Sequence, residues 1–171
     1  ILNQEVDPVQ SAVFLIALRM KRETDDENKG ILDGIRDMSN SITAEVAELL
    51  DVSDPYTGYN RTLPAAPFFP AVMAACGVPA ISHGVETMSP KFGITHHRVL
   101  RAAGIPVDLS VDKAAAQLSN KEIGWAYVDQ KMYCPALYNL TTLRRDIIKR
   151  QAITTVEVLT RPVSAKNKTH F

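Results

Sequence analysis

The stretch Ser82-His83-Gly84-Val85-Glu86-Thr87-Met88-Ser89-Pro90-Lys91-Phe92-Gly93 decides how this chain is interpreted. It follows a short apolar segment, Val78 to Ile81, that we expect to be a buried strand, and it precedes a helical pattern that begins near Thr95. A strand, then a loop with glycine, serine, histidine and lysine, then a helix is typical of anion sites in α/β proteins, because backbone N–H groups and the helix dipole favour phosphate. The alternative is that Gly84 and Gly93 are turn residues and that Lys91 is a solvated charge.

The composition is that of an ordinary globular domain. The chain has 171 residues, enough for one hydrophobic core, and its 19 basic and 19 acidic residues give a net charge of zero. This balance argues against a nucleic-acid partner, even with Lys149, Arg150, Lys166 and Lys168 near the end of the chain. No apolar run of about 18 residues occurs, so no membrane span is expected.

The two cysteines indicate a cellular location. Cys76 and Cys134 lie in apolar settings without CxxC spacing, so we expect buried free thiols in a reducing compartment. That compartment would be the cytoplasm or an organelle stroma, a plastid included. The chain begins without methionine at Ile1 and ends where a strand is expected to start, at Lys168 to Phe171, so we expect it to be a piece of a longer protein.

Helices dominate the first part of the chain. Asp7-Pro8 is a favoured helix start, and an apolar face recurs at Val9, Val13, Ile16 and Met20. Thr24 to Glu27 forms a capping box for a second helix that reaches Met38. Residues 44–50 could extend a helix or enter a short strand at Leu49 to Val52, and residues 54–61 form a turn-rich loop.

Helices and strands alternate after residue 60, which predicts a mainly parallel sheet wrapped by helices. The predicted strands are 78–81 and 123–128, and the predicted helices are 70–77, 96–103, 110–118 and one that begins at Cys134-Pro135 and reaches Ile148. His96 and His97 could be a metal pair, but adjacent helical residues point about 100° apart, so we interpret them as polar residues at a helix start. The fold class is therefore α/β with a small all-helical N-terminal domain.

The order of several short motifs resembles anthranilate phosphoribosyltransferase, a family that shares its fold with the pyrimidine nucleoside phosphorylases. The motifs are Ala12 to Thr24, Gly77-Val78-Pro79, His83-Gly84, Ser89 to Gly93, Val99 to Gly104, Ile123 to Tyr127 and Leu143-Arg144-Arg145. The resemblance covers nearly the whole chain. It implies a helical domain over residues 1–50, incomplete at its start, and the first part of an α/β domain over residues 51–171, within which helices of the small domain return.

The resemblance also implies a binding site for a diphosphate sugar. The family's Lys-His-Gly-Asn loop corresponds to Ser82-His83-Gly84-Val85, and its serine-rich loop for phosphate and metal corresponds to Ser89-Pro90-Lys91-Phe92-Gly93. The implied donor-binding residues are Asn60, His83, Gly84, Ser89, Lys91 and Gly93; those for the acceptor are His83 and Arg144, and Ser89 is the implied metal ligand. Mg²⁺ is the implied cofactor, and its acidic ligands in the family would lie beyond Phe171.

Several family residues are replaced. Ser53 to Tyr59 stands where the family has a Gly-Thr-Gly-Gly-Asp loop, so Pro55 removes a backbone donor and two tyrosines fill space that glycine would leave for phosphate. The loop at 89–93 has lost two hydroxyl donors. Two hypotheses follow: a divergent glycosyltransferase that moves a ribosyl or phosphoribosyl group from a diphosphate donor to a small acceptor, and a catalytically inactive relative that serves as a binding or structural subunit of a larger assembly. The resemblance also implies a homodimer formed through the helical domain.

Overall fold

The helical hairpin at the start of the chain is capped as the sequence predicts. In the computed structural model, which describes residues 1–171, α1 (Pro8–Lys21) begins after Asp7, whose Oδ1 accepts a hydrogen bond from the Val9 amide at 2.8 Å. Thr24 precedes α2 (Asp25–Asp37) and forms the predicted capping box with Glu27. Both helix starts are therefore confirmed.

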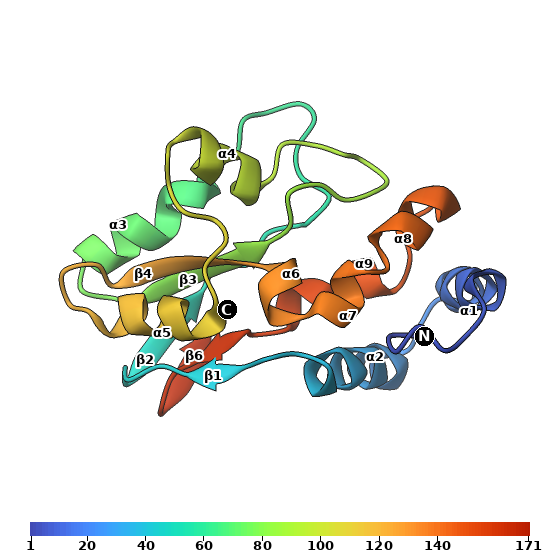
Figure 1. Cartoon of the computed structure of the whole chain (residues 1–171), viewed down its shortest axis with the longest axis horizontal. Helices are drawn as coiled ribbons and strands as arrows, with labels where there is room; N and C mark the ends of the chain where they lie inside the picture. The colour runs from blue at the N-terminus through green and yellow to red at the C-terminus, as the bar shows by residue number, and fades with distance from the viewer.

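The predicted apolar face of α1 is not the buried one. Val9, Val13 and Met20 are 70%, 63% and 78% exposed, whereas Leu15 is buried in the main core. The helix contacts α8 (Thr141–Ile147) at the margin of the molecule, so only one narrow side of α1 faces other elements (Figure 1). The exposed residues leave an apolar surface on α1.

The sheet is parallel throughout, as expected. Its strand order is β4-β3-β2-β6, and a separate two-stranded parallel sheet joins β1 to β5. The strands are β1 (Ile42–Thr43), β2 (Glu48–Asp51), β3 (Ala80–Gly84), β4 (Trp125–Asp129), β5 (Val163–Ser164) and β6 (Lys168–His170). The carboxyl ends of β3 and β4 lie side by side, because Gly84 is in register with Asp129, and the parallel strand β2 ends at Asp51 opposite Ile81, three residues before the end of β3.

Helices cover both faces of this sheet (Figure 1). Ala126 and Val128 of β4 face the main core with α5 (Val111–Ser119), while Tyr127 between them packs against Leu100 of α4 (His96–Ala102). This alternation follows from the two-residue period of a strand. A 3₁₀ turn, η1 (Ala66–Phe68), leads into α3 (Phe69–Ala75), which contacts β3 and β4.

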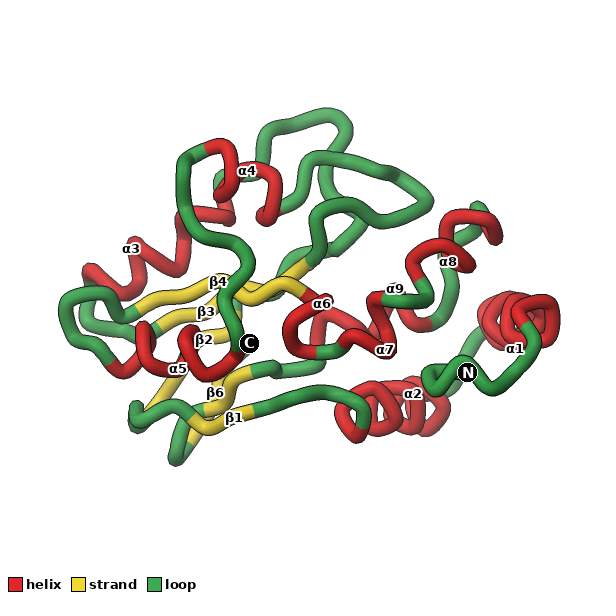
Figure 2. The backbone as a smooth tube through the Cα atoms, in the orientation of Figure 1, coloured by secondary structure: helices red, strands yellow, loops and turns green.

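The helical part of the molecule uses both ends of the sequence. Beyond β4 the chain forms α6 (Gln130–Tyr133), α7 (Pro135–Tyr138), α8, α9 (Ile153–Val156) and η2 (Glu157–Leu159). Of these, α9 contacts α2 and α8 contacts α1, so helices from residues 8–37 and 130–159 gather at one end of the molecule (Figure 2). The domain boundary at residue 50 stays a prediction. The longest helix has 14 residues, and none combines the length and hydropathy that crossing a bilayer requires.

The largest correction concerns the stretch from Val78 to Gly93. The predicted strand at Val78 to Ile81 is instead β3, Ala80–Gly84, so Ser82, His83 and Gly84 are buried strand residues rather than the start of a loop. The reason is pairing, since the register with β4 continues from Ala80 to Gly84. The loop therefore begins at Val85.

One open alternative is decided and two further predictions are corrected. Of the two possibilities for residues 44–52, the short strand is confirmed, because Glu48–Asp51 form β2 between two neighbouring strands. The helix expected from Cys134 to Ile148 is divided into α7 and α8, where the Thr141 hydroxyl donates to the Tyr138 carbonyl and the chain turns. Cys76 is exposed at the end of α3, whereas Cys134 is a buried free thiol as predicted.

Candidate functional site

Two loops cross closely at the carboxyl end of the sheet. The Gly93 amide donates to the Thr57 carbonyl at 2.9 Å, and the Asn60 side chain donates to the Lys91 carbonyl at 3.1 Å. A Cβ atom on Gly93 would lie only 2.4 Å from Asn60 Oδ1, so this crossing requires glycine. Gly58 is needed as well, since its φ is +70° and a Cβ there would meet the Gly93 backbone at 2.7 Å. The structure thus brings Asn60, Lys91 and Gly93 together.

Lys91 is the candidate residue most open to solvent. It is exposed and forms no ion pair, although its charge helps lower the pKa of Asp54. An unpaired ammonium group beside two glycine-containing loops suits an anion. Its role in binding a donor stays a prediction.

His83 lies beneath these loops and has a neighbour at each ring nitrogen. Its Nε2 is 3.2 Å from Asp51 Oδ1, and its Nδ1 contacts the hydroxyl of Tyr56. The side chain is fully buried, as in a structural core histidine, and its partners are side chains rather than backbone. His83 also lines a small cavity together with Gly84, Tyr56 and Tyr59.

A chain of buried hydrogen bonds extends from His83 into the helical part of the molecule. The Tyr56 hydroxyl is 2.6 Å from that of Tyr133 on α6, which accepts from the Thr160 hydroxyl at 3.1 Å. Burial raises the pKa of Tyr56 and of Tyr133 above the ordinary tyrosine value, so both are neutral and able to donate. These contacts couple β3 to the segment after η2.

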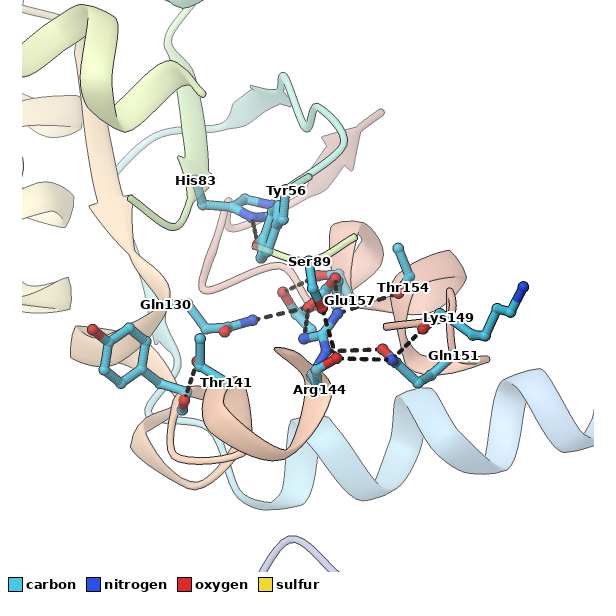
Figure 3. A network of polar contacts seen from close by, with 12 residues as sticks. Tyr56, His83, Ser89, Gln130, Thr141, Arg144, Lys149, Gln151, Thr154 and Glu157 are labelled. Atoms are coloured by element: carbon cyan, nitrogen blue, oxygen red, sulfur yellow. Dashed lines mark hydrogen bonds and ion pairs between the residues drawn. The ribbon is translucent and has the colours of Figure 1, made fainter. Parts of the chain in front are cut away.

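Arg144 is fully buried and bonded to groups of this chain (Figure 3). Its Nη1 and Nη2 each donate to a carboxylate oxygen of Glu157 at 2.7 Å, and Nη2 also donates to the Thr154 hydroxyl at 3.2 Å. Nε donates to Gln151 Oε1 at 3.3 Å, so every nitrogen of the guanidinium group has a partner. Buried charges require such partners. Arg144 is therefore not a solvated residue on a helix surface, and an acceptor carboxylate would have to displace Glu157 to reach it.

Ser89 belongs to the same buried group of residues. Its hydroxyl donates to the Arg144 carbonyl at 2.8 Å, as Figure 3 shows, and the side chain is buried. The hydroxyl proton is therefore directed at the protein and not at a ligand. The candidate residues thus divide into an exposed set, with Asn60 and Lys91 on the crossing loops, and a buried set of His83, Ser89 and Arg144.

The adjacent histidines are buried, and each faces an aspartate. His96 Nε2 is 2.6 Å from Asp54 Oδ2, and His97 Nδ1 is 2.6 Å from Asp129 Oδ2. They occupy the first turn of α4, as the preferred interpretation states, and no group of three or more metal-binding side chains occurs around them or elsewhere.

Sequence reasoning did not single out Asp54 or Glu157. Asp54 lies in a turn-rich loop, where an aspartate is ordinarily a turn residue. Glu157 follows Val156 in a short apolar segment, and a lone acid among apolar residues near a double arginine was the available signal. The pairing itself depends on how α8 and η2 pack.

Comparisons with known proteins show which proteins this chain resembles. Residues 1–39 match the model of a glycosyl transferase family, helical bundle domain. An anthranilate phosphoribosyltransferase from Thermomicrobium roseum is 28% identical over 167 residues, which covers 97% of this chain and 47% of that protein. The chain spans about half the length of curated relatives that it matches.

Solved structures of low sequence identity share the fold. Anthranilate phosphoribosyltransferase from Thermus thermophilus matches with a TM-score of 0.75 at 19% identity, over 96% of this chain and 50% of that one. The enzyme from Saccharomyces cerevisiae in complex with PRPP and Mg matches with a TM-score of 0.67 at 11% identity, over 95% of this chain and 47% of that one. The matched helical domain, the sequence relatives and the shared fold lead to one conclusion. The chain is an anthranilate phosphoribosyltransferase-like protein.

Proposed function

We propose that this protein is a divergent glycosyltransferase that moves a phosphoribosyl group from a diphosphate donor to a small acceptor. The observation that supports this most strongly is the similarity to anthranilate phosphoribosyltransferases along 97% of the chain. The acceptor differs from anthranilate in this proposal, because Arg144, its expected partner, is occupied by Glu157.

The donor's diphosphate would bind at the crossing loops. Lys91 offers an unpaired positive charge there, the Asn60 side chain joins the two loops at the Lys91 carbonyl, and the loop backbones meet directly at Gly58 and Gly93. Negative charge develops on the diphosphate as it leaves the sugar during such a transfer, so fixed cations and dipoles near the diphosphate lower the barrier. His83, Gly84, Ser89 and Gly93 would position the loops around the donor and, in the case of His83, the acceptor.

Magnesium enters the proposal through the yeast relative's complex with PRPP and Mg. The residues of this chain do not fit a protein-held ion, since no group of three or more metal-binding side chains occurs and Ser89, the expected ligand, is buried. Mg²⁺ is often held chiefly by substrate phosphates. We therefore propose Mg²⁺ as a companion of the donor's diphosphate and assign no step to it.

The assembly and location that we propose rest on two surface features. The exposed apolar residues Val9, Val13, Phe14 and Met20 on α1 suit a homodimer contact through the helical part. Two unpaired cysteines suit a reducing compartment, the cytoplasm or an organelle stroma.

A second candidate function is that of a catalytically inactive relative that serves as a binding or structural subunit of a larger assembly. The observation that favours it is the internal pairing of the buried candidates. The polar atoms of His83, Ser89 and Arg144 contact other groups of this chain through hydrogen bonds or charged neighbours. On this hypothesis the fold is retained and the donor site is not.

Calorimetric titration with PRPP and Mg²⁺ separates the two candidates. We expect micromolar binding, and we expect Lys91→Ala to weaken it at least about tenfold, because a hydrogen bond to a charged group contributes about 1.5–3 kcal/mol. Lys121→Ala is the matched control, since Lys121 is exposed in the turn before β4, at the opposite end of the sheet. An absence of binding at millimolar PRPP would refute the transferase proposal and favour the inactive subunit.

A further inference from the structure

A small cavity lies between the loop after β2 and the start of α4. It has a volume of about 10 Å³, enough for one water molecule, and Asp54, Tyr59, His83 and His96 are among the residues that line it. It adjoins the proposed donor site, because His83 and Gly84 line it as well and Lys91 lies near enough to affect Asp54. A group in this cavity would therefore lie beside the bound donor.

His96 differs from the other buried histidines in having a ring nitrogen with neither a hydrogen bond nor a charged neighbour. His83 has Asp51 3.2 Å from Nε2 and Tyr56 at Nδ1, and His97 has Asp129 2.6 Å from Nδ1 and the Arg101 guanidinium 2.7 Å from Nε2. His96 has the Asp54 carboxylate 2.6 Å from Nε2, whereas its buried Nδ1 has neither a hydrogen bond nor an ion-pair partner. Buried polar atoms normally have partners, so this one requires an explanation.

Asp54 fixes which nitrogen of His96 is free. Its carboxylate lies 2.6 Å from Nε2 and accepts the hydroxyl of Tyr59 at 2.6 Å. Burial opposes its ionisation, but the contacts with His96 and Tyr59 and the charge of Lys91 hold its pKa below the ordinary value. Beside an ionised Asp54, the neutral tautomer of the imidazole is the one with its proton at Nε2 and its lone pair on Nδ1. A base oriented by a carboxylate is the arrangement used for general base catalysis.

We propose that His96, oriented by Asp54, is the general base of the transfer reaction, which makes this inference dependent on the proposed function. The acceptor is a nucleophile with an N–H or O–H group, in contact with Nδ1 directly or through one water in the cavity. Its lone pair forms the bond to the anomeric carbon of the donor, and the bond from that carbon to the diphosphate oxygen breaks. The electron pair leaves with the diphosphate, and the acceptor's proton passes to Nδ1. Asp54 stays ionised and stabilises the imidazolium.

The test combines turnover with the state of the histidine itself. The probes are PRPP with Mg²⁺, a panel of aromatic amines that includes anthranilate, and water as the default nucleophile, whose reaction is followed by ribose 5-phosphate release. His96→Gln should lower the turnover of the intact protein by about 10²–10⁴-fold and leave PRPP affinity unchanged, and Asp54→Asn should lower it by a smaller factor. Added imidazole should restore part of the rate of His96→Gln. His170→Gln is the control, because His170 lies at the exposed edge strand beside Glu48.

Each outcome decides one proposal. Nitrogen-15 spectra of the histidine rings should show Nδ1 of His96 unprotonated at neutral pH, and a proton on Nδ1 would overturn the assignment. Turnover of His96→Gln within a few fold of wild type would overturn it too, while the transferase proposal stands. A wild-type protein that binds no PRPP would refute the proposed function and the catalytic role with it, whatever the tautomer.

Discussion

Removal of the Glu157 charge should destabilise the protein strongly. Glu157 and Arg144 have fully buried side chains and share two 2.7 Å hydrogen bonds, and Gln130 donates to the same carboxylate at 3.2 Å. Glu157→Gln leaves a guanidinium ion in the interior beside a neutral amide. Breaking a buried pair from one side costs about 3–5 kcal/mol, because the remaining charge has no compensation. We expect a loss of that size in the free energy of unfolding.

Urea denaturation measures this loss as a shift of the midpoint at unchanged slope. Asp146→Asn is a matched control, since the Arg145–Asp146 pair has side chains that are 59% and 62% exposed and should contribute less than about 1 kcal/mol. The double variant Arg144→Met with Glu157→Leu should recover most of the stability, because apolar residues of similar volume replace the buried pair. A loss below 1 kcal/mol in Glu157→Gln, or a double variant as unstable as the sum of the single ones, would refute the reasoning.

Two further predictions concern the crossing loops and the loop after β2. Gly93→Ala should destabilise the protein and weaken PRPP binding, since the new Cβ would meet Asn60 Oδ1 and the Tyr59 amide. Gly30→Ala, with no atom within 4 Å of the new Cβ, should instead stabilise α2 by about 0.5–1 kcal/mol. Thermal unfolding compares the two variants, and equal effects on the melting temperature would contradict the prediction. The hydrogen bond to Asp54 raises the pKa of Tyr59 to about 12, so the contribution of this bond to stability is complete below pH 10 and is lost as the pH rises through 12. In a spectrophotometric titration, Asp54→Asn should lower the pKa of Tyr59 toward 10, and an unchanged titration would count against the bond.

The sequence predicts the elements of this fold better than their limits. Caps at Asp7 and Thr24 and the alternation of helices and strands depend on neighbouring residues, and these predictions are confirmed. The start and end of β3 depend on pairing with β4, which lies more than 40 residues later in the chain, so the apolar segment at 78–81 could not place them. The exposure of α1 likewise depends on which helices lie beside it.

The candidate site is predictable by residue type and less so by contact. The glycines, lysine and asparagine of the crossing loops are visible in the sequence, and the structure brings Asn60, Lys91 and Gly93 together. The pairing of Arg144 with Glu157 and of His96 with Asp54 joins segments whose distance is set by tertiary packing. No local pattern records such a pairing, because each residue type has an ordinary alternative role in its own segment.

The small sheet of β1 and β5 has a mechanical consequence. These strands belong to two of the three connections between the helical part and the large sheet, and they pair in parallel at Ile42 with Val163 and at Thr43 with Ser164. The third connection is the direct passage from β4 into α6 at Asp129 and Gln130. A single connection would allow rotation about its own axis, whereas two connections that are hydrogen-bonded side by side resist rotation and allow bending. Twisting one part against the other would break this pairing, so a movement of the helical part must bend both connections together where they enter β2 and β6.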